Sequence, residues 1–366
     1  MYATLFMTSD APRLRLLPGL ALCAALAACA MALGGLPGFQ AHGLGALTLA
    51  IVLGMLVGNT VYPRWAKASG PGVHLAKQRL LRLGVVLYGL RLTTQDIASV
   101  GLAGVLIDAL VLGSTFALAC WVGTRWLGLD RSTAMLIGMG SAVCGAAAVM
   151  ATEPVLRARA EQVTVAVATV VVFGTLATFV YPLLYSLNLQ LQWVPGGAHG
   201  FGIFTGSTIH EVAQVVAAAR SIGPEAADAA VIAKMVRVMM LAPVLLALSA
   251  WLARDASGNA PRNAATHVPQ RLALPWFALG FVGMVLFHSL QLLPAPVVAV
   301  ANAVDAALLA MAMAALGLST QLGAIRRAGI RPLLLAGLLF AWLVAGGAGI
   351  NHVVAEIIFS PPGINR

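Results

Sequence analysis

Residues 206–216 read Gly-Ser-Thr-Ile-His-Glu-Val-Ala-Gln-Val-Val, and they lie among segments apolar enough to span a membrane. If the chain is helical after Ser207, at about 100° per residue, the polar residues share one face, namely Ser207, His210, Glu211 and Gln214. The opening Gly206-Ser207-Thr208 would start that helix and leave its first backbone N–H groups free. A His and a Glu at membrane depth are costly without a partner or a function. This stretch is therefore the first candidate for a functional site.

The composition places the chain among membrane proteins. Of its 366 residues, 60% are hydrophobic and 9% are charged, whereas a soluble domain carries about a quarter charged residues. Apolar segments long enough to span a bilayer recur along the chain, at 14–33, 43–63, 79–92, 97–122, 131–152, 161–187, 199–219, 226–253, 272–293, 296–318 and 331–352. The sequence predicts an all-α polytopic membrane protein with about 9–11 transmembrane segments. We expect one transmembrane domain over residues 1–366, with a polar tail at 1–13 and a linker at 254–271 between its halves.

The formal net charge of +10 comes from Lys and Arg in short connections between these segments. Such residues set orientation in a membrane, so the basic balance indicates topology and not a nucleic-acid partner. The dense basic stretch 64–82, the N-terminus and the linker are expected on the cytoplasmic side. The four cysteines lie in apolar segments, where small buried side chains are expected and not a disulfide framework: Cys23, Cys29, Cys120 and Cys144.

Residues 131–152 contain glycines at 138, 140 and 145 within one short apolar segment. This pattern indicates either a broken or re-entrant helix, which is tolerated only against protein or a watery cavity, or a close-packed Gly/Ala helix. Four side chains near the two expected breaks could supply hydrogen bonds to a ligand: Ser141, Cys144, Ser207 and Thr208.

Two spacings suggest internal repeats. A shift of 66 residues lays Gly140-Ser141 on Gly206-Ser207, and a shift of 228 lays Gly89-Leu90 on Gly317-Leu318. Loop charges add a constraint, because connections rich in Lys and Arg tend to lie in the cytoplasm. The uncharged loop 188–198 is therefore expected outside, and the loop 153–160, with two arginines, inside. Both placements are met if 131–152 enters and leaves on the cytoplasmic side and 199–219 enters and leaves on the outer side. The repeats would then be inverted, as in many secondary transporters. Two fully crossing broken helices are the alternative.

Buried ionisable groups suggest the chemistry. His210 and Glu211 suit a proton-coupling site, or else a polar packing network. Lys234 and Arg237, three apart in one span, would form a cationic face. Together with free N–H groups near Gly140, Gly145 and Gly206, that face would attract a small anion. Alternatively, the two cations snorkel or pair with Glu225 and Asp228. Asp108, near the middle of its span, is expected to face protein or a cavity and not lipid. Asp108 and Asp305 are further candidate coupling groups, and Asp305 is alternatively the partner of an internal cation.

Other classes fit less well. The stretch His210-Glu211-Val212-Ala213-Gln214 is similar to the zinc-protease motif His-Glu-x-x-His, but glutamine stands where the second zinc ligand should be. No Walker-type nucleotide loop is present. The prediction is a carrier and not an enzyme, with no metal and no cofactor beyond a proton or sodium as coupling ion. A receptor, channel or assembly protein in which the polar motif is structural remains the alternative.

At these residues the sequence resembles the YeiH family of bacterial inner-membrane proteins, commonly labelled sulfate exporters. The resemblance rests on residues 83–92, the Cys144-Gly145-Ala146 segment, residues 206–216, 234–243 and 312–318. That family is similar to the bile-acid/sodium symporter superfamily, which implies two inverted repeats with interrupted helices crossing near the midplane. The resemblance implies transport of a small anion, such as sulfate or a sulfonate, driven by protons or sodium. The expected partners are the lipid bilayer and the anion, with a homo-oligomer as a further expectation and no nucleic acid.

Overall fold

The computed structural model describes residues 15–36, 39, 45–257, 276–320 and 329–359, and over these ranges the regular structure is helical, with no strand. Helices are the expected solution, because backbone groups in hydrocarbon must be satisfied within their own segment. Within those ranges, six helices are long and apolar enough to cross a membrane, namely Leu17–Gly34, Thr94–Trp126, Ala160–Leu191, Pro224–Leu252, Ala295–Ser319 and Ile330–Ile357. Four shorter apolar helices accompany them, namely Ala46–Thr60, Ala146–Leu156, Val212–Ile222 and Trp276–Ser289. The all-α polytopic prediction is confirmed, and the number of crossings stays a prediction.

The chain forms two compact units, and the single transmembrane domain expected from the sequence stays a prediction. Unit 1 comprises Met1–Thr93 and Gly280–Leu322, and unit 2 comprises Thr94–Leu279 and Gly323–Arg366. The predicted linker does not mark this division. Its first four residues, 254–257, belong to helix α14 (Leu241–Ser257), while the rest of it and the tail at 1–13 lie outside the described residues.

Unit 1 contains α2 (Leu17–Gly34), α4 (Ala46–Thr60) and α16 (Ala295–Ser319), together with most of α15 (Trp276–Ser289). A continuous helical run joins α5 (Tyr62–Leu75), the π-helical turn η1 (Ala76–Leu80), α6 (Leu81–Tyr88) and the 3₁₀ turn η2 (Gly89–Arg91). The basic stretch 64–82 is therefore helical, and its cytoplasmic location stays a prediction. Gly54 and Gly58 of α4 lie directly against the backbone of α16, at Ala314 and Leu318, so this glycine pair allows two helices to approach closely.

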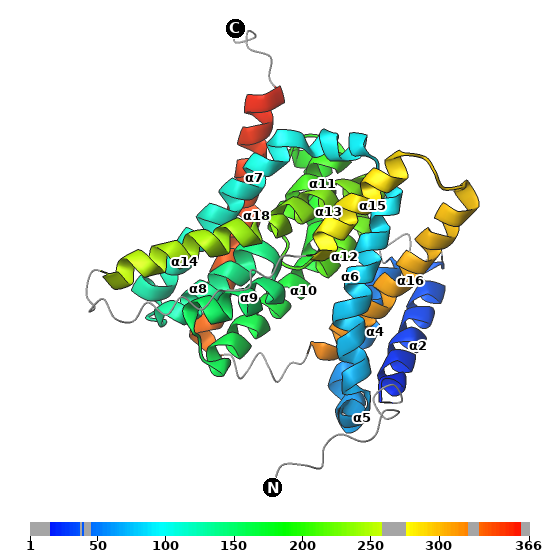
Figure 1. The fold of residues 1–366 in the computed structure, drawn as a ribbon, viewed down its shortest axis with the longest axis horizontal. Coiled ribbons are helices and arrows are strands. Elements are labelled where there is room, and N and C mark those ends of the chain that lie inside the picture. Colours follow the sequence, from blue (N-terminus) through cyan, green and yellow to red (C-terminus); the bar gives the residue numbers. More distant parts are fainter. Residues whose placement is uncertain (1–14, 37–38, 40–44, 258–275, 321–328, 360–366) are drawn as a thin grey trace. The chain divides into compact units, whose positions relative to one another are not determined.

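Unit 2 holds the long helices α7 (Thr94–Trp121), α10 (Ala160–Leu191) and α18 (Ile330–Phe359), and the consecutive pair α13 (Pro224–Met239) and α14. α7 continues into a π-helical turn, η3 (Val122–Trp126). Two interrupted segments lie among them. The first is α8 (Arg131–Met139), the π-helical turn η4 (Gly140–Cys144) and α9 (Ala146–Leu156), and the second is α11 (Gly197–Thr208) and α12 (Val212–Ile222). Figure 1 shows α11, α12 and α13 gathered together, in agreement with their packing.

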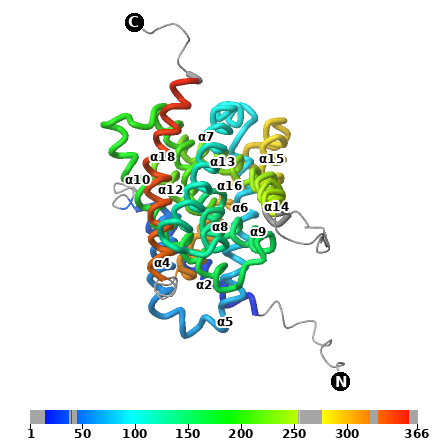
Figure 2. Tube along the Cα trace, turned by 90° about the vertical axis from the view of Figure 1, so that its left-hand side faces the viewer, coloured from blue at the N-terminus to red at the C-terminus, as the bar shows by residue number. Residues whose placement is uncertain are grey.

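The first interrupted segment is a re-entrant hairpin. Gly145 breaks it with φ +75°, a left-handed conformation that favours glycine. A straight crossing would put the ends of α8 and α9 about 37 Å apart. However, the Gln162 amide at the start of α10 donates to Asp130 before α8 at 2.6 Å, and Gln162 is only six residues beyond Leu156, about 20 Å of extended chain. α9 therefore returns to the end of unit 2 from which α8 departs, and Figure 2 shows the two side by side. We call this the α8 end.

The second interrupted segment is also a re-entrant hairpin. Gly202 of α11 lies against Ala226 of α13, and Gly206 lies against Ala230. α11 and α13 therefore run in the same direction from one end of the unit. Because α12 ends at Ile222, two residues before α13 begins, it must return to the end where α11 starts. We call this the α11 end. It is the far end of α10 from the α8 end, since α10 leads from Gln162 to the turn before α11. The hairpin geometry agrees with the re-entrant alternative and differs from the crossing helices implied by the bile-acid symporter resemblance.

The two hairpins have matching lengths. Their first helices start at Arg131 and Gly197, their second helices start at Ala146 and Val212, and these end at Leu156 and Ile222. Each pair is separated by the 66 residues found in the sequence. α7 and α10, which precede the hairpins, start at Thr94 and Ala160 with the same separation. Each hairpin packs in its own apolar cluster, one around Val149 and Val170 and one around Val215 and Phe204.

Candidate functional site

The tips of the two hairpins meet inside unit 2. The second tip differs from the helix predicted after Ser207. α11 ends at Thr208, Ile209 has extended dihedral angles, and α12 starts only at Val212, after an extended Glu211. Gly206-Ser207-Thr208 therefore ends one helix and does not start another, and the predicted shared face of Ser207, His210, Glu211 and Gln214 does not exist. The physical reason is that Glu211 serves as the N-cap of α12, which requires an extended backbone.

Glu211 joins the two returning helices at their N-termini. Its carboxylate accepts a hydrogen bond from the Ala146 N–H at the start of α9, at 3.3 Å. It also accepts from the backbone N–H of Gln214, while the Gln214 side chain accepts from the Glu211 N–H at 3.1 Å, in a reciprocal capping box. Negative charge at helix N-termini is stabilised by both the free N–H groups and the helix dipole. One carboxylate therefore serves two helix starts from different hairpins.

Lys234 and Arg237, both on α13 and fully buried, serve the opposite helix ends. The Lys234 ammonium donates to the carbonyl oxygens of Val143 and Ile209, at 2.8 and 2.7 Å. The Arg237 guanidinium donates to three more carbonyls: Ala142 at 2.6 Å, Ser141 at 2.9 Å, and Ser207. These oxygens lie where η4 and α11 terminate, the negative end of each helix dipole. The alternative that the two cations snorkel or pair with Glu225 and Asp228 is therefore wrong.

Several buried polar atoms around the tips have no hydrogen-bond partner within the described parts of the chain. They are the Ser141 hydroxyl, both ring nitrogens of His210 and the Gln214 amide nitrogen. Each such atom costs about 1–3 kcal/mol when no partner reaches it, and native proteins contain few of them. Their accumulation at one place marks the tips as a candidate ligand site.

The carboxyl group of Asp108, near the middle of α7, adds to this group. It is fully buried, and neither of its oxygens has a hydrogen-bond partner among the described residues. It lies close enough to Arg237 and Lys234 for both charges to act on it. The sequence prediction therefore placed Asp108 correctly in a protein-facing position, and the structure adds that it belongs to the same cluster. We call Asp108, Glu211, Lys234 and Arg237, together with the two tips, the tip cluster.

The remaining predicted residues of unit 2 lie at or beside the tips with more ordinary roles. The Thr208 hydroxyl accepts from the Tyr181 phenol at 2.7 Å and donates to the Phe204 carbonyl, so the protein already uses it. Cys144 is buried at the end of η4, and Gly140 packs against Val149 and Val170.

The sequence interpretation missed Asn351 of α18. Its buried amide donates to the Gly347 carbonyl at 2.8 Å and reaches the Ser207 hydroxyl at 3.4 Å. A polar residue inside the apolar run 331–352 was the available signal.

A cavity of about 440 Å³ opens at the α11 end, between α7, α11 and α18. Its lining includes Val100, Ile107, Gly196, His199, Asn351 and Glu356. Ile107 directly precedes Asp108, and Asn351 contacts Ser207 at the tip of the second hairpin. The cavity therefore leads from one end of unit 2 towards the tip cluster.

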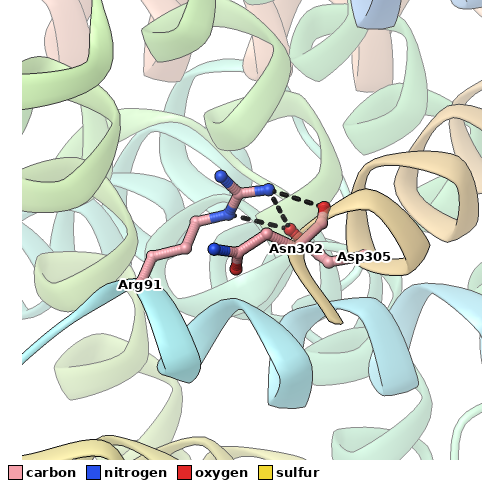
Figure 3. A network of polar contacts seen from close by, with 3 residues as sticks. All are labelled: Arg91, Asn302 and Asp305. Carbon is pink, nitrogen blue, oxygen red and sulfur yellow. Dashed lines mark hydrogen bonds and ion pairs between the residues drawn. The ribbon is translucent and has the colours of Figure 1, made fainter. Parts of the chain in front are cut away.

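Asp305 lies elsewhere, in unit 1. Its carboxylate accepts from Arg91 Nε and Nη2, both at 3.0 Å, and Arg91 also donates to the Asn302 carbonyl at 2.9 Å (Figure 3). Arg91 stacks over the ring of Tyr88 as well, 5.4 Å from its centroid. Of the two predicted alternatives for Asp305, the structure shows the internal cation partner. A role in coupling stays a prediction.

The described residues contain no group of three or more His, Cys, Asp or Glu side chains that could hold a metal ion. His210 and Glu211 are adjacent in a bend, and Gln214 caps the following helix, so the geometry of the zinc-protease motif is not formed.

These features define a class: a polytopic α-helical membrane protein in which two re-entrant hairpins meet at buried charges. Residues 18–336 match the family model described as conserved hypothetical protein 698, and the chain belongs to this family. It is 62% identical over 339 residues to the UPF0324 membrane protein PA5383 of Pseudomonas aeruginosa, covering 93% of this chain and 94% of the relative. It is 52% identical over 342 residues to the UPF0324 inner membrane protein YeiH of Escherichia coli K12, covering 93% and 95%.

The resemblance to the YeiH family is thereby confirmed, whereas the similarity to the bile-acid/sodium symporters stays a prediction. No solved structure matches the chain.

Proposed function

We propose that this protein is a secondary transporter that moves a small anion across the bacterial inner membrane, coupled to a proton or sodium gradient. The relatives named as inner-membrane proteins support the location. The main support for transport is the set of unpartnered donors and ionisable groups at the meeting point of two interrupted hairpins. Interrupted helices whose ends converge near the middle of the membrane are the usual binding sites of secondary transporters.

An anion is favoured by the charges and by the unused donors. Lys234 has three N–H donors and bonds to two carbonyls, and Arg237 has five and bonds to three. Both cations therefore keep donors for another acceptor. The Glu211 carboxylate is engaged by two helix N-termini and offsets only one of the two positive charges. A small oxyanion such as sulfate or a sulfonate could use these donors together with the Ser141 hydroxyl.

Access from two sides is favoured by the hairpins. They enter unit 2 from opposite ends with equal lengths, which supports an inverted repeat of α7–α9 and α10–α12. The α8 end carries Arg125, Arg131, Arg157 and Arg159, so we assign it to the cytoplasm. The cavity at the α11 end would then admit solute from the periplasmic side.

The test is flux into liposomes reconstituted with the purified protein. Labelled sulfate and methanesulfonate are offered under an imposed pH gradient and, separately, under a sodium gradient. We expect gradient-driven flux of at least one anion, and a loss of at least tenfold in the His210→Gln and Ser141→Ala variants. His352→Gln is the matched control, because His352 already bonds to Trp193 and Glu356 away from the tips.

Normal flux in both tip variants would contradict the proposal. Absence of flux for every anion, with tip variants that only lower thermal stability, would favour a receptor, channel or assembly protein instead.

A further inference from the structure

The tip cluster contains two cations and two carboxyl groups, and these carboxyl groups are held very differently. Glu211 accepts hydrogen bonds from the N–H groups of Ala146 and Gln214, so its negative charge is fixed by two helix starts. Asp108 accepts no hydrogen bond from the described residues and is fully buried. Of the two, Asp108 is the group whose proton can come and go without disrupting a helix cap.

The elements packed against α7 are α8, η3, η4, α11, α13 and α18. Their titratable or charged residues are Arg125, Arg131, Cys144, His199, Glu225, Asp228, Lys234, Arg237, Arg331, His352 and Glu356. Of these, Lys234 and Arg237 are the ones whose charges act on Asp108. Arg125, Arg131 and Arg331 lie at the α8 end, and His199 and Glu356 line the cavity at the α11 end. The charge around Asp108 is therefore set by the two cations of α13.

The charge count depends on one proton. With Asp108 ionised, two cations face two carboxylates and the tip cluster is neutral. With Asp108 protonated, the cluster carries one net positive charge in a buried place where an unbalanced charge is costly. A monovalent anion would restore neutrality. Protonation of Asp108 and occupation by an anion therefore stabilise each other, as two ligands of linked sites must.

We propose that Asp108 is the proton-binding group of the anion site, so that one proton enters the tip cluster with each monovalent anion. This inference rests on the proposed function and deepens it by naming the coupling ion as a proton and the residue that takes it. His210 does not serve this role. It is buried beside the same two cations, and burial and like charge both disfavour a third positive charge there. The carboxyl keeps its proton while the anion is bound and loses it to water when the anion leaves.

The experiment measures anion affinity against pH for the purified full chain, by calorimetry with methanesulfonate and sulfate. Neither anion titrates between about pH 5 and pH 9, so any proton that moves belongs to the protein. In the wild type we expect the methanesulfonate affinity to fall about tenfold per pH unit above the titration of Asp108. Repeating the titration in buffers of different ionisation enthalpy should give about one proton bound per methanesulfonate.

Two variants decide the assignment. Asp108→Asn mimics the protonated form, so its affinity should stay at the acidic wild-type level across the range, with no proton uptake. Asp130→Asn is the matched control, because it removes a carboxyl group outside the tip cluster while keeping an N-cap side chain at α8, and it should keep the wild-type slope. Should Asp108→Asn fail to fold, Asp108→Glu keeps a carboxyl and should retain a slope with a shifted midpoint.

The outcomes separate the two proposals. A wild-type affinity independent of pH, or a slope that survives in Asp108→Asn or disappears in His210→Gln, would overturn the assignment of Asp108 and leave anion transport standing. A wild type that binds neither anion at any pH would overturn the proposed function itself.

Discussion

Buried charges are handled in two ways in this molecule. In unit 1, Arg91 and Asp305 form an ion pair, since the guanidinium bonds to the carboxylate oxygen Oδ2 and to the neighbouring Asn302 carbonyl. In unit 2, Lys234 and Arg237 bond to backbone carbonyls, while the side chains of Asp108, His210 and Ser141 have no hydrogen-bond partner within the described parts of the chain. The first arrangement joins η2 to α16. The arrangement in unit 2 leaves buried polar side chains without hydrogen bonds from the described residues, which costs free energy.

The difference separates structural from functional polarity inside a membrane. Burial alone marks both sites, because Asp305 and Asp108 are each fully inaccessible. What distinguishes them is that Asp305 bonds to a cation through one oxygen, whereas neither oxygen of Asp108 has a hydrogen-bond partner among the described residues. A carboxylate paired with a cation can be explained by packing, whereas one with neither oxygen bonded needs a ligand, a proton or a second conformation.

The largest effect is expected when the tip cluster loses its main cation. Arg237→Met leaves three buried carbonyls at two helix ends without their donors, so we expect a loss of about 3–5 kcal/mol in unfolding free energy. Arg237→Lys should recover only part of this, because an ammonium cannot reproduce the guanidinium fork. Thermal unfolding in detergent measures both. A melting temperature within error of the wild type for Arg237→Met would contradict the role assigned to this side chain.

Breaking the ion pair between Arg91 and Asp305 should cause a smaller loss of stability, which a second substitution can reverse. Arg91→Met leaves the Asp305 carboxylate buried without its cation, at a cost of about 2–3 kcal/mol because Arg91 itself is partly exposed. The double variant Arg91→Met, Asp305→Asn removes the unpaired charge and should regain most of the loss. Double-mutant analysis of thermal stability gives the coupling energy. Additive losses would show that the pair is not an energetic unit.

The hairpin tip itself can be tested without changing a charge. Gly145→Ala forces a side chain into a left-handed backbone at φ +75° and into contact with the Glu211 side chain. We expect about 1–3 kcal/mol of destabilisation and weaker anion binding, because Glu211 must move. Gly101→Ala in α7 is the matched control. It also has positive φ, at +50°, but no neighbour within 4 Å of an added Cβ, so its loss should be the smaller. Equal losses of stability in the two variants would show that the contact with Glu211 does not contribute to the effect of Gly145→Ala.

The smallest effect on stability is expected at Asp130, an exposed carboxylate whose hydrogen bonds cap the start of α8. Partial burial raises the pKa of Asp130, but hydrogen bonds from Thr133 and Gln162 and the nearby Arg159 outweigh it, so the pKa lies below its usual value. The contribution of the Asp130 carboxylate to the free energy of unfolding is therefore complete above its unfolded-state pKa. It is lost as the pH falls through the folded-state pKa. Asp130→Ala should cost about 1 kcal/mol at neutral pH, as for other N-caps, and less below about pH 4.

Asp130→Asn keeps the cap without the titration, so its stability should change less with pH than that of the wild type. Thermal unfolding at several pH values measures this. An unchanged difference between the wild type and Asp130→Ala in acid would contradict the role of the charge.

Local patterns predicted the breaks but not what holds them. The cluster of glycines at 138, 140 and 145 indicated either an interruption or a close-packed helix, and the structure shows the interruption. The 66-residue spacing laid Gly140-Ser141 on Gly206-Ser207, the region of the second interruption. The helical face predicted from Ser207 to Gln214 was wrong, because Glu211 is the extended N-cap of α12 and the helix does not run through it. The spacing of Glu211 and Gln214 is itself that of a capping box, so this signal was present.

The partners of Lys234 and Arg237 lay beyond such reasoning. The carbonyls they bind at η4 are 91 to 96 residues away in the sequence, and every residue type offers a carbonyl. A sequence shows a buried cation but does not show which backbone oxygens it meets. The sequence offered Glu225 and Asp228, the nearby acidic side chains, as partners for the two cations. In the structure both cations bond to backbone carbonyls instead.

The equal lengths of the two hairpins have a consequence for the resting state of such a carrier. If the hairpins exchange roles, a distortion that opens one tip towards its end of unit 2 has a counterpart that opens the other tip in the opposite direction. The two states would then be nearly equal in free energy, apart from positions where the repeats differ. Glu211 corresponds to Gly145 at the 66-residue spacing, and Asp108 corresponds to Gly174. Which side of the membrane the empty protein faces would be decided by these few unmatched residues, and the same residues hold its charge.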